Sequence, residues 1–221
     1  MTDRLKYVPL DDAIHRYVCA HRSNAGDPLL QELRRATTAL GEDSRMQISE
    51  DQGAFLQIIT AATGVQRALE IGTFTGYSAL CIARGLRPGG KLTCLDASRE
   101  WTAIARGFWK QAGLDSQIDL RIGPALESLS VLEQDVPWDL VFIDAAKDEY
   151  DAYFEAVLPR VRPNGLILFD NMLWGGRLGR GPVQEASGKA LDALNQKLAR
   201  DPRVECVLLT VADGIQLCRV R

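Results

Sequence analysis

Two acidic residues stand where apolar runs of the sequence stop. Asp144 follows residues 140–143, and Asp170, with Asn171 behind it, follows residues 165–169. If the two runs are neighbouring parallel strands, their carboxyl ends bring two carboxylates and an amide oxygen into one small volume. Either acid alone could simply cap a loop or a helix. Together they favour a hard divalent cation, Mg²⁺ first, although Mn²⁺ and Ca²⁺ accept the same oxygen ligands.

A lysine stands close to the first of these acids. Lys147 lies three residues beyond Asp144, about one helical turn further on and over the same strand end. A lysine at the start of a helix is usually a solvated surface charge. Beside a bound cation it could instead act as a general base toward a hydroxyl that the metal has acidified.

A third candidate is the segment LEIGTFTGYSAL, residues 69–80. It reads as the end of a strand carrying Glu70, then a turn with Gly72 and Gly76, then a helix. The dinucleotide pattern G-x-G-x-x-G is absent because Phe74 takes the place of its second glycine. The turn therefore predicts a nucleoside site without a pyrophosphate cradle, and the alternative is a tight turn with no ligand.

Asp96 ends the next apolar run, residues 91–96. A carboxylate in this place can accept hydrogen bonds from both hydroxyls of a ribose. The same residue could cap the helix that comes after it. Its position one strand and one helix after Gly72 favours the nucleoside interpretation.

These residues need a sheet to position them. Apolar runs begin at Arg67, Lys91, Ile118, Trp138 and Gly165 and alternate with helical patterns, which is typical of parallel strands buried on both faces. Two further runs, 203–211 and 214–221, flank a short turn and predict a hairpin with one antiparallel strand. The predicted fold class is α/β, a Rossmann-like, doubly wound, seven-stranded sheet, mostly parallel.

The first 62 residues show helical patterns instead, at 11–21, 28–40 and 49–62. We therefore predict a single domain, 1–221, with an N-terminal helical segment (1–62) and a Rossmann-like core (63–221). The glycine-rich stretch 174–184 comes after a strand, so we expect a loop at the mouth of the site.

Composition points to small-molecule chemistry. The 221 residues are 46% hydrophobic with a net charge of -3, which argues against broad attraction to nucleic acid or an anionic membrane. There is no apolar signal segment and no run long enough to span a bilayer, so a cytoplasmic location is expected. The five cysteines lack CxxC or metal-like spacing; we expect buried free thiols and assign them no chemistry.

With these motifs in place, the chain resembles the cation-dependent class I O-methyltransferases that use S-adenosylmethionine, of the catechol and caffeoyl-CoA type. The resemblance runs from about Met46 to Arg221 and is carried by residues 68–80, 139–176 and 201–217. It implies a homodimer and a phenolic or catechol-like acceptor. One departure is that Ala145 and Ala146 precede the lysine, where relatives often carry an acid or an aromatic residue, so the acceptor is not assigned.

The resemblance also implies roles for individual residues. Asp144, Asp170 and Asn171 match the metal ligands, and Lys147 matches the base, with Asp144 beside it in the catalytic group. Trp174 and Arg177 are candidate substrate contacts, and Trp174 with Phe74 could form an aromatic wall. The residues implied for the cofactor are Met46, Glu70, Gly72, Phe74, Tyr77, Ser78, Asp96, Ala125 and Asp144.

The expected reaction is in-line transfer of a sulfonium methyl group to one of two adjacent oxygens held by the metal. Three alternatives stay open. A branch of the same family methylates a hydroxylated uridine in tRNA, and a basic rim at Arg177 and Arg180 would favour it. A nicotinamide-dependent oxidoreductase would use Asp96 but needs the absent glycine pattern. A non-catalytic binding protein would be expected to lose Lys147 or a metal ligand.

Overall fold

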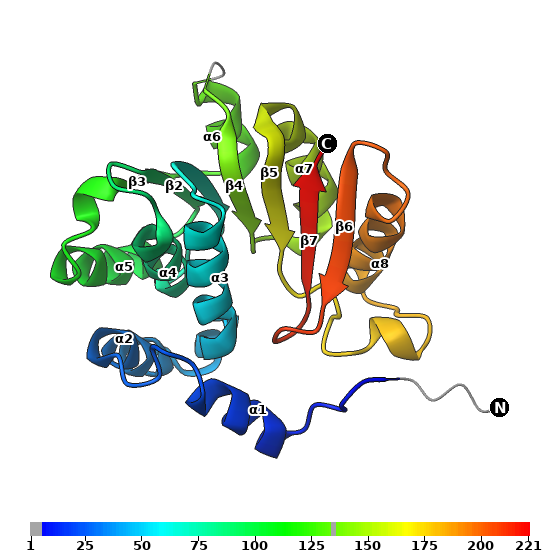
Figure 1. The fold of residues 1–221 in the computed structure, drawn as a ribbon, viewed down its shortest axis with the longest axis horizontal. Helices are drawn as coiled ribbons and strands as arrows, with labels where there is room; N and C mark the ends of the chain where they lie inside the picture. Colours follow the sequence, from blue (N-terminus) through cyan, green and yellow to red (C-terminus); the bar gives the residue numbers. More distant parts are fainter. Residues whose placement is uncertain (1–5, 134–135) are drawn as a thin grey trace.

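Seven strands form one sheet in the computed structural model, which describes residues 6–133 and 136–221 (Figure 1). Their order is β3-β2-β1-β4-β5-β7-β6, and only β7 runs antiparallel to its neighbours. This is the predicted fold class. The strands are β1 (Arg67–Ile71), β2 (Lys91–Asp96), β3 (Ile118–Ile122), β4 (Trp138–Ile143), β5 (Val161–Phe169), β6 (Val204–Leu209) and β7 (Ile215–Val220).

Helices cover both faces of the sheet (Figure 1). Apolar residues of α2 to α5 pack on one face, and those of α6 to α8 pack on the other. The helices are α1 (Asp12–Ala20), α2 (Pro28–Thr38), α3 (Glu50–Ala62), α4 (Tyr77–Gly85), α5 (Arg99–Gln111), α6 (Ala125–Val131), α7 (Tyr150–Val157) and α8 (Ala186–Leu198), with 3₁₀ turns η1 (Gly41–Met46), η2 (Asp115–Gln117), η3 (Lys147–Glu149), η4 (Leu158–Arg160) and η5 (Leu178–Arg180).

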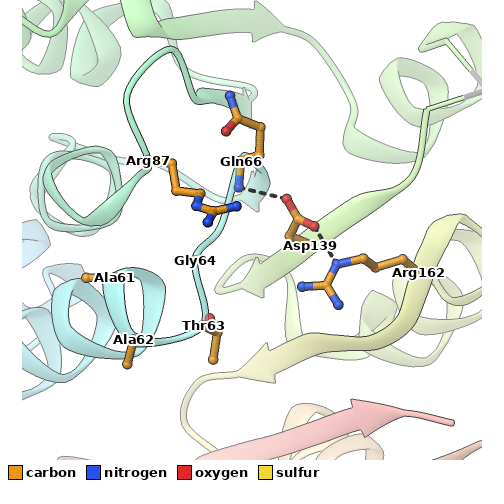
Figure 2. Close-up of a pocket in the computed structure, with 8 residues that line it drawn as sticks. All are labelled: Ala61, Ala62, Thr63, Gly64, Gln66, Arg87, Asp139 and Arg162. Atoms are coloured by element: carbon orange, nitrogen blue, oxygen red, sulfur yellow. Dashed lines mark hydrogen bonds and ion pairs between the residues drawn. The ribbon is translucent and has the colours of Figure 1, made fainter.

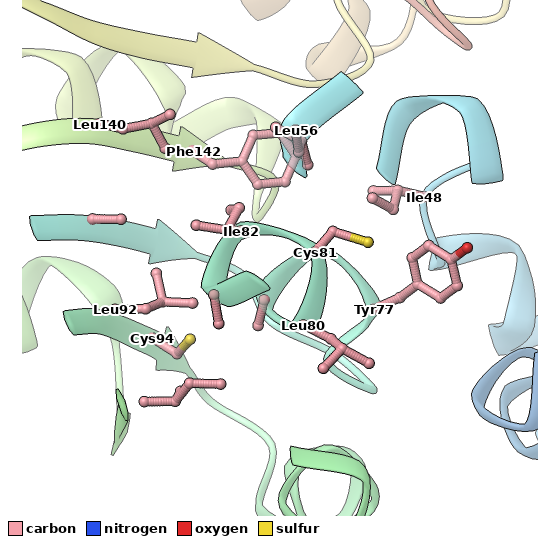
Figure 3. Packing of buried hydrophobic residues seen from close by; sticks show 14 of the residues in the cluster. Ile48, Leu56, Tyr77, Leu80, Cys81, Ile82, Leu92, Cys94, Leu140 and Phe142 are labelled. Atoms are coloured by element: carbon pink, nitrogen blue, oxygen red, sulfur yellow. The ribbon is translucent and has the colours of Figure 1, made fainter. Parts of the chain in front are cut away.

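The core has two halves because successive residues of a buried strand point to opposite faces. On β4, Leu140 and Phe142 enter the half shown in Figure 3, where they meet Leu56 of α3 and Ile82 of α4. Val141, the residue between them, enters the other half. Each fully buried side chain of this size contributes about 1.5–3 kcal/mol, so the central strands are rigid supports for the loops at their carboxyl ends.

The three predicted N-terminal helices are present, and their starts are capped as the sequence suggests. Ser49 Oγ accepts a hydrogen bond from the Gln52 N–H, and Asp27 caps α2, which has Pro28 in its first turn. Helix α1 differs from the others because it buries none of its residues against the described chain. The first five residues of the predicted segment 1–62 lie outside the described residues.

Strand β5 starts earlier than the apolar run that predicted it. It begins at Val161 and not at Gly165, and its pairing with β4 shifts register between Trp138 and Leu140. The irregularity accommodates Pro163, which cannot donate to a ladder. In the described parts of the chain, no helix combines the length and the apolar character that a bilayer span requires.

Candidate active site

The carboxyl ends of the central strands open into a cavity of about 1110 Å³. It lies where a parallel sheet of this kind usually binds its ligand, at the point where the strand order reverses between β1 and β4. Of the residues predicted for the site, only Glu70 is not among the described residues that line the cavity. The others line it: Met46, Gly72, Phe74, Tyr77, Ser78, Asp96, Ala125, Asp144, Lys147, Asp170, Asn171, Trp174 and Arg177.

Gly72 begins the turn after β1 and has a φ of +89°. A Cβ atom there would sit 1.9 Å from the carbonyl oxygen of Asp144, so no other residue fits without moving the backbone. The glycine therefore lets the end of β1 pass directly against the end of β4. This contact, more than the approach of a ligand, accounts for the glycine.

The carboxylate of Asp96 holds that turn from the other side. Its Oδ2 accepts hydrogen bonds from the N–H groups of Thr73 (2.9 Å) and Phe74 (2.8 Å), and its Oδ1 accepts one from Ser98 (2.7 Å). Phe74 has a φ of +52°, a conformation that these bonds help to maintain. Asp96 still lines the cavity, so its oxygens keep lone pairs available to hydroxyl donors.

Glu70 lies behind the turn and is fully buried. Its Oε2 accepts hydrogen bonds from Thr73 Oγ1 (2.9 Å) and Cys94 Sγ (3.4 Å), while Oε1 has no partner among the described residues. Burial raises the pKa of Glu70 to about 7, against the opposing effect of the nearby hydroxyls of Ser78 and Thr73. A buried carboxyl with an unpaired oxygen is a fitting neighbour for a cationic ligand.

Asp144 and Asp170 follow β4 and β5, which are adjacent in the sheet. Asp170 is only 3% exposed, and its Oδ1 accepts the N–H of Asn171 at 2.6 Å. Burial and the nearby Asp144 raise the pKa of Asp170 to about 7, because two carboxylates in a desolvated site resist joint ionisation. Such a pair is stabilised by a cation, which agrees with the predicted oxygen donor set.

Lys147 supplies the positive charge nearest to this pair. Its Nζ donates to Asp144 Oδ1 at 2.6 Å and to the hydroxyl of Tyr150 at 2.8 Å, and it lies 5.0 Å from the centre of the Tyr150 ring. The residue occupies the short turn η3 and not the helix itself, so its side chain is held at the cavity wall. Tyr150 is buried and was not predicted.

Asp213 orients Asn171, a role that its place in a predicted hairpin turn did not suggest. Its Oδ2 faces Asn171 Nδ2 at 3.4 Å, and its Oδ1 accepts the Gly175 N–H at 2.6 Å. A carboxylate can only accept, so the amide nitrogen of Asn171 must face Asp213, and the amide oxygen remains for a cation. Asn171 has a φ of +59°, which suits asparagine.

The loop after β5 forms the outer wall. Trp174 and Arg177 both line the cavity, with the guanidinium 5.0 Å from the centre of the indole. Arg177 is also paired with Glu185 at the start of α8. Trp174 Nε1 is buried without a partner in the described chain, and the indole packs against Gly188, where a Cβ atom would lie 3.0 Å away.

Several lining residues were not predicted from the sequence. Trp101 on α5 stacks edge-on against Phe74, with ring centres 5.1 Å apart. Tyr153 on α7 donates a hydrogen bond to Glu149, and both line the cavity. Gln52 on α3 is 1% exposed, and its Nε2 is buried near Asp170 with no hydrogen bond of normal geometry to the described residues. The sequence offered one clue to these residues: Trp101 is an aromatic residue in the first turn of the helix that follows Asp96.

A smaller hollow of about 610 Å³ lies at the opposite end of the strands, beside the start of β1 (Figure 2). There Asp139 accepts the N–H groups of Gln66 (2.7 Å) and Arg67 (2.8 Å) and pairs with Arg162 (2.5 Å). Asp139 is therefore occupied in holding the starts of β1 and β5 against β4. Apart from Glu70, the residues predicted for catalysis, cofactor and metal line the larger cavity, and none of them lines this one.

Comparison with known proteins agrees with this geometry. A sequence profile described as O-methyltransferase matches residues 20–221. Caffeoyl-CoA O-methyltransferase 2 of Eucalyptus globulus is 36% identical over 94% of this chain and 88% of its own length. Tricin synthase 1 of Oryza sativa subsp. japonica is 34% identical with the same two coverages.

Solved structures are similar throughout. An O-methyltransferase from Bacillus cereus in complex with SAH has a TM-score of 0.86 and 32% identity, covering 95% of this chain and 97% of that one. TomG of Streptomyces achromogenes, an O-methyltransferase in complex with SAM, has a TM-score of 0.81 and 29% identity, with coverages of 88% and 90%. The fold and the strand-end site thus define a methyltransferase. The chain belongs to the O-methyltransferase family, whose profile spans nearly all of it.

Proposed function

We propose that this O-methyltransferase uses S-adenosylmethionine and a divalent cation to methylate a catechol-like or other vicinal-oxygen small molecule. The observation that carries the proposal is the sharing of one cavity by two groups of residues. The turn at Gly72 with Asp96 forms one side, and Asp144, Asp170 and Asn171 form the other. We also propose that residues 1–221 work as a single domain, with 1–62 as its N-terminal segment.

The cofactor is proposed to bind along the turn. Asp96 would accept the ribose hydroxyls, since backbone N–H groups already fix its carboxylate in place. Glu70, beneath the turn, would balance the positive charge of the methionine portion through its unpaired Oε1. Trp101 and Phe74 offer ring surface for adenine. The remaining proposed contacts are Met46, Tyr77, Ser78, Ala125 and Asp144.

The cation is proposed to bind Asp144, Asp170 and the amide oxygen of Asn171. Carboxylate and amide oxygens suit Mg²⁺, with Mn²⁺ and Ca²⁺ as competitors. Among the described residues of the wall, five are acidic and three basic, an excess of negative charge that favours a cation. The acidic ones are Asp96, Asp144, Glu149, Asp170 and Asp213.

When bound, S-adenosylmethionine supplies an electrophilic methyl group, and a divalent cation acidifies an acceptor hydroxyl. Lys147 is the proposed base that takes the hydroxyl proton at Nζ. The Tyr150 hydroxyl helps to hold that nitrogen in place by accepting a hydrogen bond from it. Asp96 and Glu70 would hold S-adenosylmethionine while its methyl group passes to the acceptor oxygen and the electron pair of the methyl–sulfur bond stays on sulfur. The residues of the chain contribute mainly by holding both reactants in line.

The acceptor is inferred from the relatives and from the wall. A caffeoyl group carries two adjacent hydroxyls on one ring, and two neighbouring oxygens are what a cation with open positions binds best. Trp174 and Tyr153 would flank such a ring. Arg177 is a proposed contact for the outer part of the acceptor.

No observation favours a tRNA acceptor as a second candidate. Arg177 is paired with Glu185, and Arg180 does not line the cavity. Membership of the O-methyltransferase family removes the nicotinamide-dependent alternative. A homodimer remains part of the proposal, because Tyr7, Val8 and Tyr17 of the N-terminal segment expose apolar surface that a second copy would cover.

One experiment tests the proposed function directly. Purified protein is incubated with methyl-labelled S-adenosylmethionine and a panel of catechols, hydroxycinnamates, flavonoids and tRNA, with Mg²⁺ or with excess EDTA. We expect label in a vicinal-oxygen phenol only when Mg²⁺ is present. Equal transfer in EDTA would refute the metal, and label in tRNA alone would refute the acceptor class.

A further inference from the structure

A cluster of metal-ligating side chains lies outside the cavity, where α1 crosses the start of α3. His15 and Cys19 are one turn apart on α1, and Asp51 is in the first turn of α3. One ligand atom from each lies within 4.8 Å of the other two. None of the three lines the catalytic cavity. All three are partly buried, so the cluster is accessible to ions but shielded from bulk solvent.

The two separations that involve sulfur are close to those around a tetrahedral ion. With bonds of about 2.3 Å to sulfur and about 2.0 Å to nitrogen or oxygen, tetrahedral geometry puts sulfur about 3.5 Å from its nitrogen and oxygen neighbours. Cys19 Sγ lies 3.6 Å from His15 Nε2 and 3.8 Å from Asp51 Oδ1. Cys19 Sγ therefore already lies near the tetrahedral spacing from both of its partners, and His15 and Asp51 offer their ligand atoms within 4.8 Å of each other.

The surroundings orient the ligands. Ser49 Oγ donates to Asp51 Oδ1 at 2.5 Å, a fixed outer partner of the kind that supports metal-bound carboxylates. Burial, with the negative charges of Asp51 and Glu50 adding to it, raises the pKa of Cys19. The thiol donates its proton toward Asp51 Oδ1, so an ion that binds sulfur must displace that proton.

We propose that His15, Cys19 and Asp51 bind a Zn²⁺ ion, with water completing the coordination. Mixed sulfur, nitrogen and oxygen ligands select zinc over Mg²⁺, which the oxygen-only site in the cavity prefers. Binding forms a zinc–sulfur bond and releases the Cys19 proton to solvent. The site does not depend on the proposed reaction.

The ion would fasten α1 to the rest of the fold. Helix α1 has no fully buried residue against the described chain, and the polar contacts near α3 include this cluster and, just after α1, the Arg22–Glu50 ion pair. Zinc would replace weak contacts with coordinate bonds and hold α1 against the first turn of α3, which directly follows residues 46–49 of the cavity wall.

Cobalt is the probe that separates the two metal sites. Tetrahedral Co²⁺ bound to a thiolate gives an intense charge-transfer band, whereas Co²⁺ with oxygen ligands alone does not. We expect one equivalent of Co²⁺ to produce this band in the full-length protein and one equivalent of Zn²⁺ to abolish it. Mg²⁺ in large excess should leave the band unchanged.

Matched variants test the ligands. Cys19→Ser and His15→Ala should weaken Co²⁺ binding by more than the roughly 10- to 100-fold that loss of an outer partner costs. Cys206→Ser and His21→Ala are controls, because Cys206 is the other partly buried cysteine and His21 the only other histidine. Absence of the band in the wild-type protein, or its persistence in Cys19→Ser, would overturn the proposal.

Thermal unfolding gives a second readout. An ion that binds only the folded state raises the melting temperature by mass action. Zn²⁺ should raise it in the wild type and in both controls but not in Cys19→Ser. Mg²⁺-dependent methylation can fail while these results hold, so this proposal and the proposed function are separable.

Discussion

Lys147 Nζ lies 2.6 Å from Asp144 Oδ1, so the proposed base is paired with a proposed metal ligand. A cation entering the site must compete with this ammonium for the carboxylate. Lys147 should therefore weaken metal binding at Asp144 in addition to its proposed role in proton transfer.

Lys147→Ala should therefore separate the two effects. We expect turnover to fall by about 10²- to 10⁴-fold, the usual contribution of a general base. Affinity for Mg²⁺ should rise several-fold, because the competing charge is gone. Kinetics and calorimetric metal titration measure both, and Lys197→Ala is the control, because this half-buried lysine is paired with Asp151 and Glu155 away from the cavity. Wild-type turnover would reduce Lys147 to a surface charge.

Asp144→Ala and Asp170→Ala should each abolish Mg²⁺-dependent methylation, since each removes a proposed ligand. Binding of S-adenosylmethionine should largely survive, because the Asp96 hydrogen bonds to the turn are untouched. Methyl transfer and calorimetric cofactor binding are measured in parallel, with the exposed Asp151→Ala as control. Undiminished turnover in either variant contradicts the metal mechanism.

Asp213→Ala tests the orientation of Asn171. The variant frees the amide to rotate, so its oxygen is no longer fixed for a cation. Loss of an outer partner usually costs about 10- to 100-fold in metal affinity. Mg²⁺ dependence of turnover gives the apparent affinity, and Asp119→Ala at the exposed sheet edge is the comparison. An unchanged Mg²⁺ requirement would show that Asp213 does not orient Asn171 for the metal and serves only to stabilise the loop at Gly175.

Glu70→Gln predicts a change in the pH dependence of stability. The folded pKa of about 7 exceeds the unfolded value of about 4.5, so the folded state holds an extra proton between these values. The contribution of Glu70 is fully present below about pH 4.5 and is lost as pH rises toward 7. Over that window the variant should gain about 3 kcal/mol relative to the wild type. Urea unfolding from pH 5 to 8 measures it; a constant difference would show that Glu70 does not titrate there.

Gly72→Ala should destabilise the fold by at least about 3 kcal/mol, because its Cβ atom would overlap the Asp144 carbonyl in a backbone conformation unsuited to alanine. Gly107→Ala in α5 is the matched control. It has open space around it, and alanine at a helical position should stabilise by about 1 kcal/mol. Denaturant unfolding compares the two. Equal effects would mean that β1 and β4 can separate at little cost.

The main features of the fold were predictable because buried parallel strands leave continuous apolar runs. The same runs placed Asp144 and Asp170, since an acid at the end of such a run must emerge at the sheet edge. Pattern alone could not show which way Glu70 points. It stands inside β1 and faces the core, whereas the other two acids come after their strands.

The residues that were missed depend on long-range packing. Asp213 reads as part of a hairpin turn, and only the pairing of β7 with β5 carries it to Asn171. Trp101 and Tyr153 reach the cavity through the placement of their helices over the sheet, which periodicity does not specify. Cys19 and Asp51 are 32 positions apart, so no local spacing announced their cluster.

The contact between Gly72 and the Asp144 carbonyl divides the cavity into a part that tolerates redesign and a part that does not. Any side chain at position 72 displaces the end of β4, so the inner wall cannot be altered there without altering the sheet. The loop 174–184 gives Trp174 and Arg177 to the outer wall, and its contacts with the rest of the fold include Asp213, Glu185 and Gly188. New acceptor preferences are therefore best sought by varying this loop, because changes there leave Asp144, Lys147 and Asp170 in place.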